Sequence, residues 1–517
     1  MMLLSKLLHN IVPLPPSPDI EITHLCNDSR QARRGSLFFA RQGAQVDGAQ
    51  FITAAQKGGA VAIIHDATTP ANLDIPAIRV GDINAVQANI AARFFDHPST
   101  RFHLCGITGT NGKTTITYLL EKFWSPARTG VIGTVNFRYG EQVLPAPNTT
   151  PDSLTLQSLF ADMVQHKVTH VALEVSSIGL EQKRTKGCQF DSAVFTNLTQ
   201  DHLDYHQSME EYYQAKKLLF TEGMSSSSKK NKLAVINIDD PAGERLCREL
   251  AGSHLPIETF STAGKQATAS LEGADYQIEQ TRASVLIKGK KHTLTTNLLG
   301  EHNLKNILTS LLVGWHSGCD MPSMLKQLVH FTVPGRLERV PHTRCFVDYA
   351  HTPDALTNVI TAIRQVLQKE DVHARLLVVF GCGGDRDHTK RPLMGAIVAC
   401  LSDVSIVTSD NPRTESPRKI IDDILPGITK NQSPFEGTKG YLIIEDRRQA
   451  IHHALELATA KDVVLIAGKG HEDYQIIGTQ KTHFDDREVV REWMEKRKHE
   501  NTRDEGRRNA KCKMKGL

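Results

Sequence analysis

Apolar residues gather along the chain in short runs separated by polar or helix-length stretches, as in a protein that alternates strands and helices. Strand-like runs occupy residues 36–40, 60–65, 102–106, 170–175, 193–198, 233–238, 345–349, 376–380, 404–408, 441–445 and 463–467. The last five recur at helix-length intervals, which predicts a parallel, doubly wound sheet. Asp446 opens a capping-box pattern that predicts a helix start, whereas the polar run 225–231 predicts a flexible surface loop.

A glycine-rich segment follows the run that starts at Phe102. Residues 106–115 read Gly-Ile-Thr-Gly-Thr-Asn-Gly-Lys-Thr-Thr, and the apolar stretch after them is typical of a helix. Glycines let successive backbone amides turn toward one anion, the helix N-terminus adds its positive dipole end, and Lys113 is placed to reach terminal phosphates. The segment predicts an ATP-driven reaction. Because Gly106 lies one residue earlier than in the usual P-loop pattern, a nucleotide-switch interpretation is weakened; a chance tight turn is the simpler alternative.

Length and segment pattern together predict an α/β fold with three domains. At about 100–200 residues per domain, 517 residues suffice for about three. We expect a small N-terminal α/β domain over residues 1–98, a central P-loop ATPase-like domain with a parallel or mixed sheet over 99–332, and a C-terminal doubly wound, Rossmann-like domain over 333–495. Residues 496–517 are expected to form a basic, disordered tail.

Composition and charge narrow the function classes. The net charge of +4 comes from the tail, where no aromatic residue interleaves the Lys and Arg as a nucleic-acid stacking surface requires. We therefore expect a solvated extension rather than an RNA or membrane contact. No apolar run approaches the ~20 residues of a membrane span, and the first residues lack a signal-peptide pattern. The nine cysteines include no Cys-x-x-Cys pair, so we expect a cytoplasmic protein without a zinc site or disulfide framework.

Charged residues follow three of the predicted C-terminal strands at their carboxyl ends, where parallel sheets bind ligands. The three loops carry Arg386, then Asp410 and Arg413, then Glu472. Guanidinium groups suit a carboxylate, and carboxylates suit an ammonium group. The set predicts a site for a zwitterionic amino acid, with incidental charge on surface loops as the alternative. Cys382, in the first of these loops, is expected to be a packing residue rather than a nucleophile.

Ten short motifs in order make the chain similar to the Mur ligase family, and to its MurE type. They are Asp28-Ser-Arg, the glycine-rich segment 106–115, Asn148-Thr-Thr-Pro, Glu174-Val-Ser-Ser, Asp201-His-Leu-Asp-Tyr-His, Ala215-Lys216, Pro334-Gly-Arg, Asp348-Tyr-Ala-His-Thr-Pro, Gly381-Cys-Gly-Gly-Asp-Arg-Asp and Asp410-Asn-Pro-Arg. The resemblance covers about residues 22–495. It implies an ATP-dependent ligase of peptidoglycan precursor synthesis. Such a ligase turns a carboxylate of UDP-N-acetylmuramoyl-L-alanyl-D-glutamate into an acyl phosphate, joins it to an amino acid, and releases ADP and phosphate.

The resemblance also implies an ATP and metal site. ATP contacts are implied for Gly109, Thr110, Asn111, Gly112, Lys113, Thr114, Thr115, Asn303, Asn306, Arg336 and Asp348. Mg²⁺ is implied at Thr114, Thr134, Glu174, His202 and Lys216, the last as a carbamate formed with carbon dioxide. Taken alone, Lys216 would be interpreted as a helix-surface lysine. Catalytic roles are implied for Lys113 and Lys216, and His351 is a candidate base for the incoming amine.

The resemblance also implies two sets of substrate-binding residues. The nucleotide sugar is implied at Ser29, Gln45, Thr149, Thr150, Ser176, Gln182 and Arg184, and the amino acid at Arg386, Asp410, Asn411, Pro412, Arg413, Gly468 and Glu472. In this family the Asp-Asn-Pro-Arg form accompanies meso-2,6-diaminopimelate, whose distal carboxylate and ammonium groups match Arg413 and Glu472. L-Lysine would leave Arg413 unpaired in a buried site. The resemblance therefore favours diaminopimelate, and we expect a monomer without a nucleic-acid partner.

Three residues differ from the family pattern, and three alternative functions remain to be considered. Ile178, His302 and Ala44 stand where the family commonly has other residues, which leaves their local contacts undefined. The alternatives are a folylpolyglutamate synthetase-like ligase, a P-loop switch protein without an amino-acid pocket, and an RNA-binding protein that uses the basic tail. The Asp28-Ser-Arg segment and the Asp410-Asn-Pro-Arg loop argue against the first of them.

Overall fold

The structure is a computed structural model of the chain, and it describes residues 1–13, 19–43, 47–66, 73–203, 205–497 and 499. Ala44, Gln45 and nearly all of the predicted tail lie outside the described residues. The chain divides into two compact units. The first comprises Met1–Leu198, Glu210–Phe260 and Ile307–Met321, and the second comprises Thr199–Met209, Ser261–Asn306 and Pro322–Leu517.

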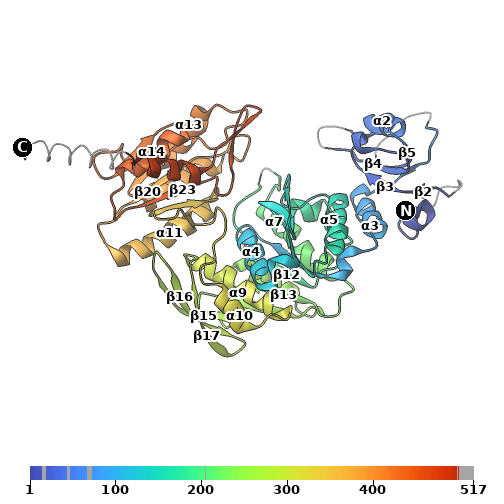
Figure 1. The fold of residues 1–517 in the computed structure, drawn as a ribbon, viewed down its shortest axis with the longest axis horizontal. Helices are drawn as coiled ribbons and strands as arrows, with labels where there is room; N and C mark the ends of the chain where they lie inside the picture. The colour runs from blue at the N-terminus through green and yellow to red at the C-terminus, as the bar shows by residue number, and fades with distance from the viewer. Residues whose placement is uncertain (14–18, 44–46, 67–72, 204, 498, 500–517) are drawn as a thin grey trace, which may run out of the picture. The chain divides into compact units, whose positions relative to one another are not determined.

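The N-terminal part of the first unit is a small parallel sheet with helices (Figure 1). Its strands run in the order β3 (His24–Cys26), β4 (Ser36–Ala40), β5 (Ala60–His65) and β6 (Ala77–Arg79). Helices α1 (Leu4–Leu8), α2 (Ile52–Lys57) and α3 (Ile83–Phe94) and the short pair β1 (Met2–Leu3) and β2 (Glu21–Ile22) complete it. Leu37 and Phe39 belong to one apolar cluster and Phe38 to another. Both faces of β4 are therefore buried, as its uninterrupted apolar run predicts.

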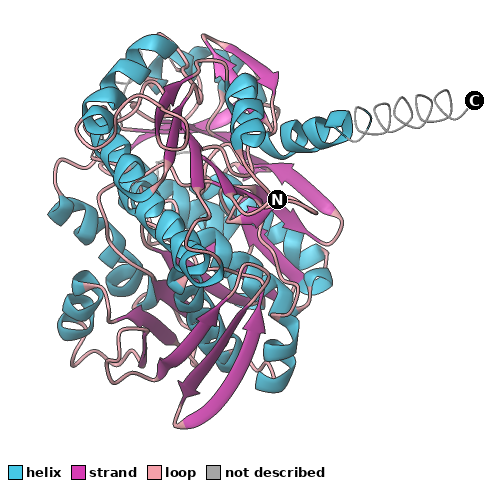
Figure 2. Cartoon of the chain, turned by 90° about the vertical axis from the view of Figure 1, so that its left-hand side faces the viewer, coloured by secondary structure: helices cyan, strands magenta, loops and turns pink. Residues whose placement is uncertain are grey.

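A mixed sheet in the first unit carries the glycine-rich loop. The strands of this sheet that belong to the first unit run in the order β10-β9-β8-β11-β7-β12-β13-β14, parallel from β8 to β14 and antiparallel at β9 and β10. The strands are β7 (His103–Thr108), β8 (Thr129–Ile132), β9 (Asn136–Tyr139), β10 (Gln142–Pro145), β11 (His170–Glu174), β12 (Ser192–Phe195), β13 (Leu233–Asn237) and β14 (Ile257–Ser261). The helices are α4 (Lys113–Trp124), α5 (Ser153–Gln165), α6 (Ser177–Glu181), α7 (Met209–Leu218) and α8 (Pro241–Glu249), with a π-helical segment at Leu219–Met224. Figure 2 shows helices lying along the strands.

The second unit contains a doubly wound sheet, as predicted. Its order is β18-β19-β23-β20-β21-β22, parallel except at the edge strand β18. The strands are β18 (Glu338–Arg339), β19 (Cys345–Asp348), β20 (Leu376–Phe380), β21 (Val404–Val407), β22 (Gly440–Ile443) and β23 (Val463–Ala467), and the helices are α11 (Pro353–Glu370), α12 (Lys390–Leu401), α13 (Pro417–Thr429) and α14 (Arg447–Leu457). Residues of α11, α12 and α13 share one apolar cluster with Val378, and residues of α14 share another with Val379. Helices therefore bury both faces of the sheet.

The remaining elements were not predicted from the sequence. Strands β15 (Ala269–Tyr276), β16 (Thr281–Ile287) and β17 (Lys290–Thr296) form an antiparallel meander, followed by α9 (Glu301–His316) and α10 (Met321–Gln327), and β24 (Tyr474–Ile477) pairs with β25 (Gln480–His483). In the described part of the chain, no helix combines the length and apolar character needed to cross a membrane.

Residues 225–231 form a largely exposed loop, as predicted for a surface segment, whereas their flexibility stays a prediction. Ser227 is buried and its hydroxyl donates to the Phe190 carbonyl at 2.8 Å. Lys229 donates to the Phe102 carbonyl at 2.7 Å and pairs with Asp191 at 2.9 Å. The polar residues of this segment thus bond to the starts of neighbouring strands, which its composition alone does not reveal.

Candidate active site

The glycine-rich loop joins the carboxyl end of β7 to the start of α4. Gly109 and Gly112 have φ values of 141° and 91°, a backbone conformation that glycine adopts without strain. A Cβ on Gly109 would lie 1.8 Å from the Thr196 hydroxyl, so a side chain cannot fit there. The Lys113 ammonium donates to the carbonyls of Gly109 at 2.7 Å and Thr110 at 2.9 Å. The Lys113 side chain thus lies against the glycine-rich loop, whose backbone amides are predicted to bind phosphate together with it.

Residues after β12 hold this loop in shape. The Thr196 hydroxyl donates to the Asn111 carbonyl at 2.6 Å, and the Asn111 amide donates to the Asn197 side chain at 2.9 Å. The Thr110 amide donates to the Asn197 carbonyl at 3.0 Å. Thr196 and Asn197 were not predicted as site residues. Their position at the carboxyl end of a strand next to β7 is the signal that would have identified them.

Glu174, at the end of β11, forms a small oxygen-rich cluster with threonines. The Thr134 hydroxyl donates to Glu174 Oε2 at 2.9 Å, and its amide donates to Oε1 at 3.2 Å. Thr134 and Thr149 hydroxyls lie 3.0 Å apart. A Cβ on Gly133 would lie 2.3 Å from Glu174 Oε1, which explains the glycine. Carboxylate and hydroxyl oxygens are suitable Mg²⁺ ligands, so this cluster fits the predicted metal in ligand chemistry.

The other predicted metal ligands lie elsewhere along the chain. His202 is counted with the second unit, has a φ of 55° and lies 3.6 Å from the Asp201 carboxylate. Among the described residues, no three His, Cys, Asp or Glu side chains gather as a metal-binding group. Mg²⁺ commonly binds through one or two protein ligands together with phosphates and water, which a single buried carboxylate such as Glu174 can support.

Lys216 is buried in α7, with 1% of its surface exposed, so the interpretation as a surface lysine is wrong. Its ammonium nitrogen lies 4.2 Å from the centre of the Tyr212 ring. The Tyr212 hydroxyl lies 3.3 Å from the Thr110 hydroxyl in the glycine-rich loop. Lys216 is therefore separated from that loop by a single side chain. A buried lysine beside a phosphate site fits a functional role better than a solvated one, because burying its charge is costly.

Five residues assigned to the nucleotide sugar form one network in the first unit. Arg184 donates to the Thr150 carbonyl at 2.6 Å and to the Gln182 side chain at 2.8 Å. The Thr150 hydroxyl accepts from the Ser176 amide at 2.9 Å. Thr149 joins them through Thr134, as described above. Ser29 lies in a short turn after Asp28, and the structure gives it no contact with this network among the described residues; Gln45 lies outside them.

Asp348 and His351 follow β19 in the second unit. Burial raises the pKa of Asp348 to about 6, although the charge of Arg336 and the amides of Leu337 and Ala350 favour its ionised form. Burial, and then the charge of Lys390, lowers the pKa of His351 to about 4. His351 Nδ1 lies 2.7 Å from the Tyr349 carbonyl and must donate to it, which leaves Nε2 as an unprotonated acceptor at neutral pH.

Two asparagines predicted at the nucleotide are also in the second unit. Asn303 and Asn306 are buried on α9. Asn303 donates to the Leu299 carbonyl at 2.8 Å and accepts from Asn306 at 3.2 Å. The first contact fixes the start of α9, so Asn303 has a structural role whether or not it meets a nucleotide.

The loops after β20, β21 and β23 bring the predicted amino-acid residues together. A Cβ on Gly383 would lie 3.0 Å from Arg413 Nη1 and 3.8 Å from Arg386 Cγ, so both arginines flank this glycine. A Cβ on Gly468 would lie 2.5 Å from Asp410 Oδ2, so the third loop meets the second. The structure thus places guanidinium groups and carboxylates at one edge of the sheet.

Asn411 joins the second and third of these loops. Its amide donates to Glu472 at 2.8 Å, and its oxygen accepts from Lys469 at 3.3 Å and from the Ile476 amide at 3.0 Å. Burial, and then the charge of Asp410, raises the pKa of Glu472, while Lys469 opposes that rise. Lys469 is fully buried and was not predicted as a site residue, although it stands next to Gly468 in the sequence.

Cys382 has the packing role expected of it. It is buried, and its sulfur lies 3.6 Å from that of Met394. Burial raises the pKa of the Cys382 thiol to about 12, so the reactive thiolate is disfavoured.

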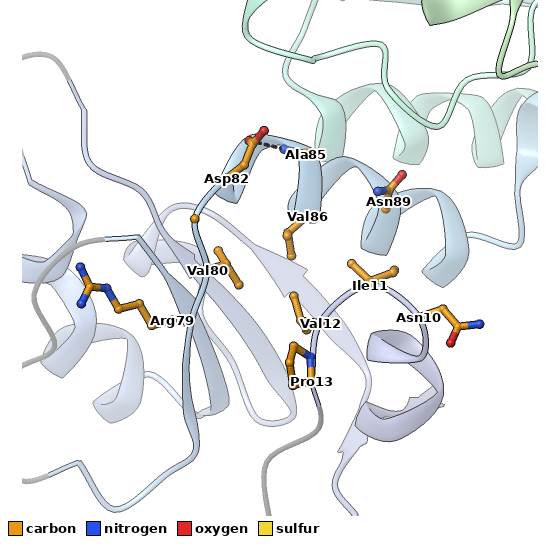
Figure 3. Close-up of a pocket in the computed structure, with 11 residues that line it drawn as sticks. Asn10, Ile11, Val12, Pro13, Arg79, Val80, Asp82, Ala85, Val86 and Asn89 are labelled. Atoms are coloured by element: carbon orange, nitrogen blue, oxygen red, sulfur yellow. Dashed lines mark hydrogen bonds between the residues drawn. The ribbon is translucent and has the colours of Figure 1, made fainter.

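A cavity of about 370 Å³ lies apart from these residues in the N-terminal part of the first unit (Figure 3). It is lined by Ile11 and Val12, by the turn at Val80–Asp82 and by Val86 and Asn89 of α3. Asp82 accepts from the Ala85 amide at 2.9 Å and caps α3. None of the predicted site residues lines this cavity, and we assign it no ligand.

Comparison with known proteins assigns the chain to one family. Three family models match it: the Mur ligase family, catalytic domain, over residues 21–95, the Mur ligase middle domain over 107–314, and the Mur ligase, glutamate ligase domain over 335–470. A UDP-N-acetylmuramoyl-L-alanyl-D-glutamate--2,6-diaminopimelate ligase of Gloeobacter violaceus is 44% identical over 93% of this chain and 95% of its own.

Solved structures give the same result. The structure of a UDP-N-acetylmuramoyl-L-alanyl-D-glutamate--2,6-diaminopimelate ligase matches with a TM-score of 0.66 and 33% identity, over 96% of this chain and 99% of that chain. The MurF ligase of Thermotoga maritima in complex with ADP shares the fold, with a TM-score of 0.60 at 20% identity over 87% of this chain and 94% of that chain. The chain therefore belongs to the Mur ligase family, as its ten motifs predict.

Proposed function

We propose that this chain is a MurE-type ligase that uses ATP to add meso-2,6-diaminopimelate to UDP-N-acetylmuramoyl-L-alanyl-D-glutamate in peptidoglycan precursor synthesis. The observation that carries the proposal is the set of opposite charges beyond β20, β21 and β23, on a chain 44% identical to a ligase of that name. A glycine-rich phosphate loop on a separate sheet supplies the ATP chemistry that such a ligase needs.

The proposed reaction has two steps. A carboxylate oxygen of the D-glutamyl residue attacks the γ-phosphorus of ATP, the bond to the β-phosphate oxygen breaks, and ADP leaves. The amine of diaminopimelate then attacks the acyl carbon, phosphate leaves with its electron pair, and the nitrogen loses a proton. Lys113 and the loop amides offset the charge repulsion of the first step and stabilise the charge that develops on the transferred group.

Mg²⁺ and a carbamate on Lys216 belong to the proposal. Thr114, Thr134, Glu174, His202 and carbamylated Lys216 would hold the metal, which supplies further positive charge at the phosphates. Glu174 and Thr134 fit because they present oxygen ligands from neighbouring positions. Lys216 fits because it is buried beside Tyr212, close to the phosphate loop. A carbamate would replace a buried cation with an anion that favours a metal.

His351 is proposed as the base for the incoming amine. Its Nε2 is an acceptor at neutral pH, as the hydrogen bond of Nδ1 requires. A pKa of about 4 makes it a weak base, so it serves best where the proton leaves a nitrogen that is already positively charged.

Specificity for diaminopimelate is proposed to come from the distal end of the amino acid. Arg386 and Arg413 suit a carboxylate, and Asp410 and Glu472 suit an ammonium group. The raised pKa of Glu472 indicates a site where a second carboxylate and burial disfavour its charge, which an arriving ammonium would reverse. L-Lysine lacks the distal carboxylate and would leave a guanidinium without an anionic partner.

The experiment that tests this function measures Mg²⁺- and ATP-dependent product formation from UDP-N-acetylmuramoyl-L-alanyl-D-glutamate by chromatography and mass. A diaminopimelate adduct supports the proposal, whereas an adduct formed equally with L-lysine contradicts the assigned specificity. The domain boundaries at 98/99 and 332/333, the cytoplasmic location, the monomeric state and the absence of a nucleic-acid partner stay predictions.

A further inference from the structure

The two arginines of the amino-acid pocket stand on loops that are bonded to each other. We call residues 381–387 the Arg386 loop and residues 409–415 the Arg413 loop. The Gly384 amide donates to the Asn411 carbonyl at 2.9 Å, and Arg413 donates to the Gly384 carbonyl at 2.8 Å. The Thr414 hydroxyl donates to Asp385 at 2.8 Å. The position of one guanidinium group therefore depends on the loop that carries the other.

A buried ion pair lies behind these contacts. Arg391, at the start of α12, is fully buried. Its two terminal nitrogens donate to the two oxygens of Glu415 at 3.0 and 2.8 Å, a bidentate pair. Arg391 also donates to Asp423 of α13 at 2.8 Å and to the Gly383 carbonyl at 3.3 Å. One side chain thus contacts both loops and the helix that follows the second.

Glu415 completes the connection from the other side. Its carboxylate accepts the backbone amide of Asp385, a residue that has a φ of 54° in the Arg386 loop. The bidentate bond from Arg391 lowers the pKa of Glu415 to about 2, so its carboxylate stays ionised at any pH at which the protein works. The chain of contacts runs from the Arg413 loop through Glu415 to the backbone next to Arg386.

We propose that Arg391 and Glu415 are positioning residues for the amino-acid pocket, which fix the distance between Arg386 and Arg413 so that both meet the carboxylate groups of the substrate. The inference rests on the proposed function for the identity of that substrate. Arg386 and Arg413 both flank Gly383. Arg391 and Glu415 hold the backbone on either side of this point, because Arg391 donates to the Gly383 carbonyl and Glu415 accepts the Asp385 amide.

The first test is Glu415→Gln in steady-state kinetics. Loss of the charged bidentate pair is expected to raise KM for diaminopimelate about tenfold, with kcat and KM for ATP changed less than about twofold. Arg391→Lys keeps the charge but loses the planar fork, so it is expected to give a similar, smaller rise. Equal changes in all three constants would indicate a general structural defect and would overturn the proposal.

The matched control is an exposed ion pair on α13, the helix that begins two residues after Glu415. Arg418 and Asp422 of α13 pair at 3.1 Å and are both more than half exposed. Asp422→Asn is expected to leave KM for diaminopimelate unchanged. A rise as large as that of Glu415→Gln would mean that loss of any negative charge near the start of α13, rather than the connection between the loops, lowers the affinity.

A double-mutant cycle tests the coupling itself. In an Arg413→Ala background the mutual placement of two arginines no longer matters, so Glu415→Gln is expected to add only about two- to threefold to KM. A full, additive tenfold effect would contradict a role that acts through the arginines.

Amide hydrogen exchange separates this inference from the proposed function. Glu415→Gln is expected to accelerate exchange at Asp385 and Thr414 without changing β20 or β21, because the loops open together. If the unmodified protein formed no diaminopimelate adduct, the proposed function would be wrong. The exchange rates of the Asp385 and Thr414 amides would still show whether Glu415 holds the Arg386 loop and the Arg413 loop together. Unchanged exchange at both amides would overturn this inference.

Discussion

Arg413 and Arg391 lie in the same domain, and their partners differ in kind. The Arg391 guanidinium group binds the carboxylates of Glu415 and Asp423, whereas the hydrogen bonds of the Arg413 guanidinium group within the described part of the chain go to the carbonyls of Gly384 and Asn411. A neutral carbonyl binds a guanidinium group more weakly than a carboxylate does. An arriving carboxylate can therefore displace the partners of Arg413 with a gain in free energy, which supports the proposal that Arg413 binds the substrate.

Arg413→Ala is accordingly expected to raise KM for diaminopimelate by about 10- to 100-fold, the worth of one charge-assisted hydrogen-bonded pair. Binding of ATP should be unchanged. The measurement is KM for each substrate by phosphate release, with the exposed Arg418→Ala as the control. Unaltered kinetics with diaminopimelate would refute a role for Arg413 in the pocket.

Lys113→Ala is expected to reduce phosphate release by at least about 100-fold, because the ammonium group that offsets the charge of the transferred phosphoryl group is lost. Binding of the nucleotide sugar should persist, since Thr150, Ser176 and Arg184 bond to one another without Lys113. Calorimetric titration with the nucleotide sugar checks this. Loss of binding together with activity would point to misfolding rather than to a catalytic role.

At the scale of elements, the strands and the loops after them differ in how well the sequence predicts them. The runs at 36–40, 376–380 and 463–467 coincide with β4, β20 and β23, because a strand buried on both faces needs an unbroken apolar run. Asp446 accepts from the Gln449 amide at 2.8 Å and starts α14, as its capping pattern predicts.

The residues that were missed act through distant partners. Lys469, Glu415 and Thr196 bond across loops that are far apart in sequence, and no local pattern records such pairs. The meander β15–β17 was missed because its exposed face is polar, which hides the strand pattern. Motif resemblance predicted candidate ligand-binding residues, whereas the residues that hold them in place emerged only from the structure.

Two buried histidines at the starts of β7 and β11 should make the stability of the fold depend on pH. His103 and His170 are register partners with ring centres 5.6 Å apart, and Trp124 stacks on His170 at 5.0 Å. Burial, and then His170, His316 and Lys229, lowers the pKa of His103 to about 3. Burial also lowers the pKa of His170, against smaller opposing effects of a backbone hydrogen bond with Ser317 and of Asp191. These rings are therefore held neutral in the folded protein.

Stability should consequently fall as pH decreases below about 6.5, the unfolded-state value, and continue to fall toward pH 3, because only the unfolded chain takes up these protons. The expected slope is up to about 1.4 kcal/mol per pH unit for each histidine. Urea unfolding at pH 7.5 and 5.5 measures it, and His103→Gln should reduce the difference while exposed His254→Gln should not. An equal difference in both variants would contradict the assignment.

At the scale of the whole molecule, the assigned residues are divided between the two compact units. The phosphate loop, Glu174, Lys216 and the network around Arg184 belong to the first, and Asp348, His351 and the amino-acid pocket belong to the second. The phosphate loop and the residues proposed for amino-acid capture thus belong to different sheets, while some residues proposed for ATP, such as Asp348, belong to the second unit. Such a ligase should release phosphate steadily only when an amino acid that binds in the pocket beyond β20, β21 and β23 is present to accept the acyl group.

The most direct test of this account is phosphate release by the purified protein with Mg²⁺, ATP and UDP-N-acetylmuramoyl-L-alanyl-D-glutamate, compared with meso-2,6-diaminopimelate, L-lysine or no amino acid. We predict sustained release with diaminopimelate and at least about 100-fold less with L-lysine or without an amino acid. Equal release with L-lysine, or release that does not depend on any amino acid, would contradict the central claim that the charged loops beyond β20, β21 and β23 select diaminopimelate.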